Sequence, residues 1–235
     1  MYPKFIIGLL FCCTATMLSA QTGVGQNIGK WDSQIYISDV NGRPVNNRYT
    51  DVNGYPFVFE HFKLGTIELK NGRKFAEVPL KLDIVAHEVL FTSSNREEGI
   101  ISSDFVLQVS VKDTTPAQID TCLYRTGFPP IDNYKSREFC QVLADGKLTL
   151  LKTMRKAVDT RKNDLSGEIY KEFALYEDFY VYQNGEMKRL KKDKAFLLML
   201  MHDKRDEMVK YLKQDKKNIK NPQILAETFK YYNGL

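Results

Sequence analysis

The stretch TIELKNGRKFAEV, Thr66 to Val78, decides the fold of this chain. Its first part, Thr66 to Lys70, alternates between polar and apolar residues, which is the period of a strand with one buried face. Asn71-Gly72 comes next, and both residues tolerate the positive φ angles that a tight hairpin turn requires. Lys74 to Val78 then forms the second strand of the hairpin, which runs back along the first. The stretch therefore predicts an antiparallel hairpin.

The same pattern recurs along the chain as far as about residue 190. The further predicted strands are Val78 to Val85, Glu88 to Thr92, Phe105 to Val111, Cys122 to Tyr124, Phe139 to Leu143, Lys147 to Thr153, Lys171 to Tyr176, Phe179 to Gln183 and Met187 to Leu190. Asp145-Gly146 and Asn184-Gly185 predict two more hairpin turns. A loop with Gly127, Pro129 and Pro130 interrupts the series between Thr126 and Ser136.

Phe105 to Val111 is the clearest single strand. Strict alternation predicts one face with Phe105, Leu107, Val109 and Val111, and an opposite face with Val106, Gln108 and Ser110.

Helical periodicity begins only near Lys191. Three segments carry it, Ala195 to His202, Lys204 to Gln214 and Pro222 to Tyr232. Asp203 and Asn221 suit helix N-caps, and Pro222 suits a first helical position. The predicted fold class is α+β: mainly antiparallel β-structure, as a hairpin-rich sheet or a sandwich-like or barrel-like arrangement, followed by short C-terminal α-helices. We expect a β-rich domain over 21–190 and a basic helical segment over 191–235, packed on or beside it.

The first twenty residues predict export. Lys4 and the amino terminus form a positive region, Phe5 to Met17 is apolar but short for a membrane span, and small residues precede Gln21. We interpret 1–20 as a removed signal peptide, with Cys12 and Cys13 in the discarded part. No later segment has the length of an apolar membrane span, so we expect a mature chain that is soluble or peripherally attached. The expected location is the periplasm or the cell envelope, and secretion is less favoured.

Signal removal leaves Cys122 and Cys140 as the two remaining cysteines. An even number of cysteines in an oxidising compartment favours a disulfide, which would stabilise the fold by about 3 kcal/mol. The alternative is two separate buried thiols, because sequence does not show whether the two residues approach each other.

The net charge of +5 is uneven. From Lys188 to Leu235 there are 13 Lys and Arg against 6 Asp and Glu, so the basic character belongs to the C-terminal helices. Their lysines could meet nucleic acid, anionic lipid or an acidic partner, but we favour a solvated helix face. Export also argues against a nucleic-acid partner.

Several motif-like stretches fail on spacing. Asp-Val-Asn-Gly occurs at Asp39 to Gly42 and at Asp51 to Gly54, but an EF-hand needs glycine at the sixth position and glutamate at the twelfth. We interpret the repeats as twin turns. GVGQNIGKW, Gly23 to Trp31, lacks phosphate-loop spacing, and Phe91 stands where His87-Glu88 would need a second zinc ligand. The sequence therefore predicts no catalytic residue, metal site or cofactor.

Three runs carry a resemblance: NGYPFVFEHFKLGTIELKNGRKFAEVPLKLDIVAHEVLF from Asn53, FCQVLADGKLTLLK from Phe139, and EFALYEDFYVYQNGEMKRLKKDKAFLLMLMHDKRDEMVKYLK from Glu172. They resemble a broad group of uncharacterised exported proteins of Bacteroidota with a hairpin-rich region and a short Lys-rich helical C-terminus. The resemblance implies export and architecture, without an activity. The chain's ending differs from the β-rich sorting domains of that phylum, which favours retention in the envelope.

Two functional hypotheses follow. The first is a non-catalytic envelope protein, binding or structural, which contacts an unknown protein or glycan through the aromatic residues Tyr176, Phe179, Tyr180 and Tyr182. The second is a periplasmic hydrolase acting on glycans through paired carboxylates. Its candidate carboxylates are Glu60, Asp83, Glu88, Glu172 and Glu177. We favour the first, because no catalytic signature was found.

Overall fold

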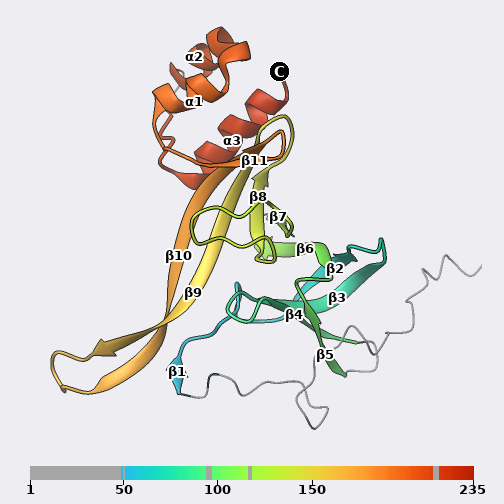
Figure 1. Cartoon of the computed structure of the whole chain (residues 1–235), viewed down its shortest axis with the longest axis vertical. Helices are drawn as coiled ribbons and strands as arrows, with labels where there is room; N and C mark the ends of the chain where they lie inside the picture. The colour runs from blue at the N-terminus through green and yellow to red at the C-terminus, as the bar shows by residue number, and fades with distance from the viewer. Residues whose placement is uncertain (1–48, 50, 94–96, 116–117, 214–216) are drawn as a thin grey trace, which may run out of the picture. The chain divides into compact units, whose positions relative to one another are not determined.

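A computed structural model describes residues 49 and 51–235, without 94–96, 116–117 and 214–216 (Figure 1). The described residues all belong to one unit, Trp31–Leu235. Their eleven strands form a single, mainly antiparallel sheet in the order β1-β10-β9-β8-β7-β6-β2-β3-β4-β5, with β11 paired to β10. Helices follow at the C-terminus, so the predicted α+β class is confirmed. The predicted signal peptide, the first Asp-Val-Asn-Gly repeat and Gly23 to Trp31 lie outside the described residues.

The strands are β1 (Val52–Asn53), β2 (Lys63–Leu69), β3 (Lys74–Asp83), β4 (Glu88–Thr92), β5 (Glu98–Ser102), β6 (Val106–Thr115), β7 (Gln118–Arg125), β8 (Cys140–Ala144), β9 (Thr149–Lys162), β10 (Ile169–Gln183) and β11 (Glu186–Arg189). The helices are α1 (Lys194–Leu200), the short 3-10 helix η2 (His202–Lys204), α2 (Arg205–Lys213) and α3 (Pro222–Asn233).

The hairpin predicted from Thr66 to Val78 is confirmed. Ile67 lies opposite Phe75, and the turn between β2 and β3 has Gly72 at φ +85°. Asn71 Oδ1 accepts a hydrogen bond from the Arg73 N–H at 3.1 Å, which fixes the turn. At the β10–β11 turn, Asn184 and Gly185 both have positive φ, as the primed hairpin turns require.

The predicted faces of the Phe105 to Val111 strand are partly wrong. Val109 and Val111 share a buried face, but Phe105 and Leu107 are exposed, and Val106 is fully buried instead. The pairing explains the difference: Glu68 lies opposite Gln108, but the next residue, Leu69, lies opposite Val106. This bulge leaves Leu107 without a partner on β2 and reverses the alternation before it.

Strands β8–β10 are covered on both faces. On one face, Leu150 of β9 and Val181 of β10 pack into a cluster with Leu197, Leu225 and Phe229 of the helices. On the opposite face, Leu151 and Tyr180 pack with Cys140 and with Phe128 and Tyr134 of the loop after β7. A third cluster fills the space against β2–β6. Both faces of β9 and β10 are covered only as far as β8 pairs with β9. The part of these two strands beyond that point contains the site described below.

Of the two predicted helix N-caps, one is confirmed and the other is wrong. Asn221 Oδ1 accepts the Gln223 N–H at 2.8 Å, which confirms Asn221 as the N-cap of α3 with Pro222 in first position. Asp203 is not an N-cap, since it lies inside η2. Its carboxylate instead accepts hydrogen bonds from Lys147 Nζ and from the Tyr232 hydroxyl. Asp193 caps α1, which the sequence analysis did not anticipate.

Asp203 makes stability depend on pH. Hydrogen bonds from Lys147 and Tyr232 lower the pKa of Asp203 from its ordinary 3.8 to about 2. The pKa of Asp203 is lower in the folded protein than in the unfolded chain. The contribution of Asp203 to the free energy of unfolding is therefore complete above about pH 4 and is lost as the pH falls toward 2. We expect Asp203→Asn to lower the Tm at pH 7 and to lose this difference near pH 2, measured by far-UV circular dichroism. A Tm difference that stays constant across this range would contradict the assignment.

Candidate binding surface

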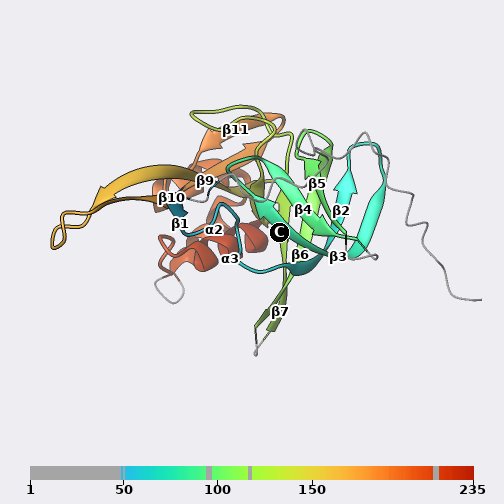
Figure 2. The ribbon, with the colours of Figure 1, turned by 90° about the horizontal axis from the view of Figure 1, so that it is seen from below.

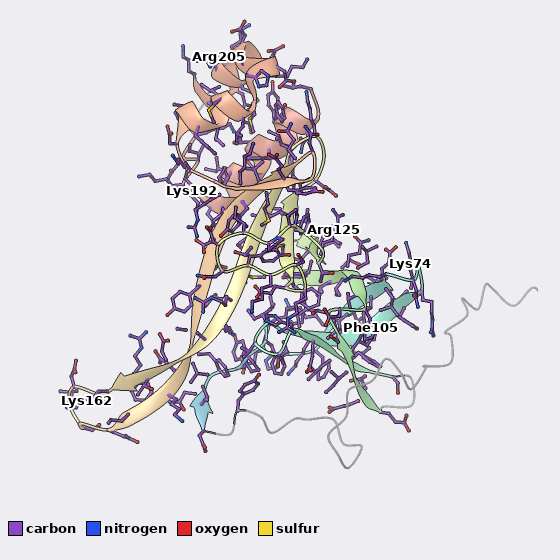
Figure 3. All side chains as sticks on the ribbon, in the orientation of Figure 1. Lys74, Phe105, Arg125, Lys162, Lys192 and Arg205 are labelled. Carbon is purple, nitrogen blue, oxygen red and sulfur yellow. The ribbon has the colours of Figure 1, made fainter. Side chains whose placement is uncertain are left out.

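The hairpin of β9 and β10 extends beyond the rest of the sheet. Strand β8 pairs with β9 only as far as Thr153, whereas β9 continues to Lys162 with β10 as its partner. Figures 1 and 2 show this hairpin leaving the sheet. In Figure 3, Lys162 lies next to its turn and Arg205 lies among the helices. We call Met154–Glu177 the arm. It is mostly a two-stranded ribbon, because β1 joins β10 only at Lys171 and Glu172.

The turn of the arm is held by its own hydrogen bonds. Asn163 Oδ1 accepts the N–H groups of Leu165 and Ser166, at 2.9 and 3.2 Å. The carbonyl of Asn163 accepts the Gly167 N–H, and its amide donates to the carbonyl of Glu168, both at 2.8 Å. Leu165 stands at this turn with its side chain 99% exposed. The loop therefore presents an aliphatic side chain in a pre-organised backbone, which lowers the entropy cost of a contact.

One face of the arm carries apolar side chains between lysines. Val158, Ile169, Phe173 and Leu175 share this face by register with Lys156, Lys162 and Lys171, and three of the four apolar residues are exposed. Phe173 is partly covered by Tyr49 in an edge-to-face contact with ring centroids 5.3 Å apart. Exposed apolar side chains that lie near one another on a two-stranded ribbon are candidates for an interaction surface.

The other face of the arm is polar and internally paired. Arg161 binds Glu172 at 3.0 Å, and the Tyr176 hydroxyl donates to Asp159 at 3.1 Å. The Arg155 guanidinium lies 4.6 Å from the Tyr176 ring centroid. These contacts stiffen the ribbon, because they join β9 to β10 across the strands. The arm thus carries its exposed aliphatic strand residues, together with lysines, on one face and a cross-strand charge network on the other.

The root of the arm is fixed by a network around Asp132. Asp132 Oδ2 accepts hydrogen bonds from Tyr180 and from Arg189, each at 2.9 Å, and Arg189 also binds Asp178 at 2.8 Å. The Arg189 and Tyr180 hydrogen bonds lower the pKa of Asp132, and burial raises the pKa of Tyr180 to about 12. A hollow of about 40 Å³ lies beside this network, between Glu138 and Tyr176. Such a volume has room for ordered water beside the network.

The four aromatic residues proposed as a partner surface do not form one. Tyr180 is buried in the core under the loop after β7, and Tyr182 packs edge-to-face on Phe128 at 5.1 Å. Phe179 points to the opposite face, where the Lys192 ammonium lies 3.7 Å from its ring centroid. Tyr176 alone of the four is exposed, and it belongs to the arm.

The structure brings together one pair of the candidate carboxylates. Asp83 and Glu88 lie opposite each other at the β3–β4 turn, and both are buried. Asp83 Oδ1 accepts the Val85 and Ala86 N–H groups at 2.8 and 2.7 Å, so it shapes the turn. On β10, Glu172 binds Arg161 and Glu177 binds Lys152, both at 3.0 Å. Glu60 is exposed, away from these pairs in sequence.

His87 has a carboxylate neighbour, Glu138. Its Nε2 lies 3.8 Å from Glu138 Oε1. Burial lowers the pKa of His87 and raises the pKa of Glu138, so both tend toward their neutral forms. Ser103 donates its backbone N–H to the His87 carbonyl, but its hydroxyl is fully buried and makes no hydrogen bond among the described residues. A buried hydroxyl with no base in contact is not an activated nucleophile.

The predicted disulfide between Cys122 and Cys140 is not formed in the structure. The two cysteines lie on neighbouring strands, but Cys140 is opposite Arg125, three residues from Cys122. Residues three apart on a strand point to opposite faces and lie about 10 Å apart, beyond the reach of a disulfide. Both are thiols in the structure, and burial raises the pKa of Cys140 to about 12. The structure thus has two separate thiols, with Cys140 buried and Cys122 partly buried.

Some lysines of the helical segment make local contacts. Lys194 Nζ donates to the Leu212 carbonyl at 3.4 Å, and the Lys217 ammonium lies 4.6 Å from the Tyr211 ring centroid. Tyr211 in turn stacks on Tyr231, with centroids 4.1 Å apart. Lys191, Lys210, Lys213, Lys220 and Lys230 are exposed, which agrees with the expected solvated face.

Two further features bear on function. In the part of the chain that the structure describes, no three His, Cys, Asp or Glu side chains gather where they could hold a metal ion. The helices in that same part are all too short or too polar to cross a membrane.

The fold and surface define a mainly antiparallel β-protein with a projecting two-stranded arm and a C-terminal helical cluster. Comparison with protein-family models, with curated proteins and with solved structures finds no match to this chain. Its function therefore has to be argued from its own surface.

Proposed function

We propose that this chain is an exported, non-catalytic protein of the periplasm or cell envelope that binds a partner through its β9–β10 arm. Export rests on the sequence of residues 1–20 and on the resemblance to exported proteins of Bacteroidota. The binding role rests on the arm. A two-stranded ribbon that buries little apolar surface gains little stability from its own length, so an ordered arm of this kind is better explained by contacts with another molecule.

One observation carries the proposal. Five of the thirteen exposed large hydrophobic residues among the described residues lie on the arm, at Val158, Leu165, Ile169, Leu175 and Tyr176. Leu165 and Ile169 mark its end and are the two most exposed of them, at 99% and 69%. Aliphatic side chains fit an apolar pocket in a protein, whereas glycans are held mainly by aromatic stacking and hydrogen bonds. The partner is therefore better described as a protein than as a glycan.

The hydrolase hypothesis has weaker support. Asp83 and Glu88 face each other, but both are buried, and the Asp83 carboxylate already accepts two backbone amides of its turn. A glycosidase needs its two carboxyl groups on either side of an accessible sugar. The carboxylates of β10 are held in ion pairs with Lys152 and Arg161.

A comparative affinity purification tests the proposal. The tagged full-length protein is expressed in its native host, periplasm and membranes are separated, and proteins that co-purify are quantified by mass spectrometry. We expect a stoichiometric partner that is reduced at least about tenfold by Leu165→Ser combined with Ile169→Ser, the size of effect seen when anchor side chains are lost. The double variant should keep its Tm, because both side chains are exposed.

Met199→Ser is the matched control, since Met199 is an exposed apolar residue of α1. This variant should capture the partner as the unmodified protein does. Equal capture by the arm variant, or a loss confined to the Met199 variant, would contradict binding through the arm. A protein that purifies without any partner would remove the support for a binding role.

A further inference from the structure

The outer edge of β10 has an open section between two covered ones. Toward the end of the arm, β1 pairs with Lys171 and Glu172. Toward the helices, β11 pairs from Tyr180 onward, and the Leu190 N–H donates to the Phe179 carbonyl at 2.8 Å. Among the described residues, no strand or loop makes a backbone hydrogen bond to the outer edge between these points. We call this section, Ala174–Asp178, the edge window.

The direction of the backbone groups in the edge window follows from the pairing. The Phe179 carbonyl points outward, since it accepts from Leu190 on the β11 side. Amide and carbonyl groups of alternate residues point the same way along a strand, and β10 pairs with β9 here without a bulge. Leu175 and Glu177 therefore direct their N–H and C=O groups away from β9. The edge window presents two donors and two acceptors in strand geometry.

The side chains around the edge window are also open. Leu175, Tyr176 and Glu177 are exposed one after another. Because consecutive residues of a strand point to opposite faces, both faces of β10 keep exposed surface here. On the face of Leu175, its β9 partner Lys156 donates hydrogen bonds to the carbonyls of Tyr55 and Phe57, so that segment lies close by. The edge window has no proline or bulge, and the charged residues that it carries are Glu177 and Asp178.

The two ends of the edge window limit what can occupy it. A second copy of this chain would carry β1 and β11 on the same edge of its own β10. Pairing the two β10 strands over the edge window would drive β1 of one copy into β10 of the other. The occupant is therefore a short extended segment, about five residues long, whose ends leave the plane of the sheet.

The residues of the edge window indicate the chemistry of the segment. Leu175 and the neighbouring Phe173 lie on the same face, and they favour apolar side chains across from them. Glu177 and Asp178 stand at the other end, where they pair with Lys152 at 3.0 Å and with Arg189 at 2.8 Å. Both carboxylates keep exposed surface beside these partners, and like charges directly opposite them would be destabilising. Resting on the proposed binding function, we infer that the edge window binds a partner protein by adding one short extended peptide as a strand, with basic residues facing Glu177 and Asp178 and apolar residues facing Leu175.

A synthetic peptide tests this inference directly. The probe is fluorescein-labelled Arg-Lys-Thr-Val-Thr-Val amide, which in antiparallel pairing sets Arg and Lys against Asp178 and Glu177 and its first Val against Leu175. We expect saturable binding to the purified full-length chain by fluorescence anisotropy. Two control peptides have Asp-Glu in place of Arg-Lys, or N-methyl groups on the Lys and first Val amides. Each should bind at least about tenfold more weakly, through charge repulsion or loss of two strand hydrogen bonds.

The matched protein variant is Leu175→Pro. Proline removes an N–H that points outward, so the pairing of β10 with β9 is kept, and proline is tolerated at such edge positions. This variant should bind the probe at least about tenfold more weakly, while the Met199→Ser control binds it normally. If Leu175→Pro does not fold by circular dichroism, the N-methylated peptide makes the same test from the ligand side.

Several outcomes would overturn the inference. The probe does not bind, or the N-methylated or acidic peptide binds as tightly as the probe. A third such outcome is that Leu175→Pro binds the probe as tightly as the unmodified protein does. A dimer that Leu175→Pro dissociates in sedimentation would assign the edge window to a second copy instead. A native partner captured by Leu175→Pro but lost from the Leu165→Ser, Ile169→Ser double variant would leave the binding function in place and reject strand addition. A native partner captured equally by Leu175→Pro and by the Leu165→Ser, Ile169→Ser double variant would reject the proposed binding through the arm.

Discussion

Phe229→Ala is expected to destabilise the protein by about 4 kcal/mol, the range for removing a fully buried aromatic side chain. Phe229 lies in α3 with no exposed surface. It packs in the cluster that joins Leu212 and Leu225 of the helices to Leu150 and Val181 of the sheet. Its removal leaves a cavity between the two layers, which the neighbouring side chains fill only in part. The free energy of unfolding is measured from urea transitions followed by far-UV circular dichroism.

Lys230→Ala is the control for Phe229→Ala. Lys230 follows Phe229 in the same helix but is exposed, and alanine is a good helix former. This variant should change stability by less than about 0.5 kcal/mol. If the Phe229 variant lost no more stability than the Lys230 variant, the helices would not form a common core with the sheet.

Gly65→Ala is expected to cost about 3 kcal/mol or more, in the upper range for overpacked sites. Gly65 lies in β2, opposite Val78 of β3 and Val111 of β6. A Cβ at this position would lie 2.4 Å from the Ser110 carbonyl oxygen and 3.0 Å from Leu80 Cδ2. The carbonyl is backbone, so it cannot move aside without disturbing the pairing of β2 with β6. The same urea transitions measure the loss.

Gly127→Ala separates this clash from a conformational effect. Gly127 has φ +89°, but a Cβ there would have no neighbour within 4 Å. Its replacement should cost about 1 to 2 kcal/mol, the strain of a left-handed alanine. Gly65→Ala should cost more, even though Gly65 does not have a positive φ. A smaller loss at Gly65 than at Gly127 would mean that β2 does not approach β6 as closely as described.

The hairpins could be predicted from the sequence because their signals are local. Asn71-Gly72 and Asn184-Gly185 each specify a turn within a few residues, and the apolar alternation beside them marks the strands. The helices were predictable for the same reason, with Asn221 and Pro222 at the start of α3. The bulge at Leu107 was not, since it depends on how β6 pairs with a strand 40 residues away.

The arm could be predicted only in part, because its strands do not need a buried face. The predicted strand Lys171 to Tyr176 lies within β10, but residues 155–162 are rich in charged side chains and lack regular apolar alternation, and the predicted strand before them ended at Thr153. The strand form of 155–162 is set by cross-strand pairing, as between Arg161 and Glu172. The edge window depends on which strands are missing beside Leu175, which no local pattern encodes.

Site-specific photo-crosslinking in the native host tests the central claim most directly. A photoreactive phenylalanine analogue replaces Leu165 at the end of the arm or, as a control, Met199 on α1; both positions are exposed. We predict a single crosslinked protein from position 165, identified by mass spectrometry, and none from position 199. Crosslinks from 199 but not from 165, or none from either position, would contradict the account of the arm as the binding element.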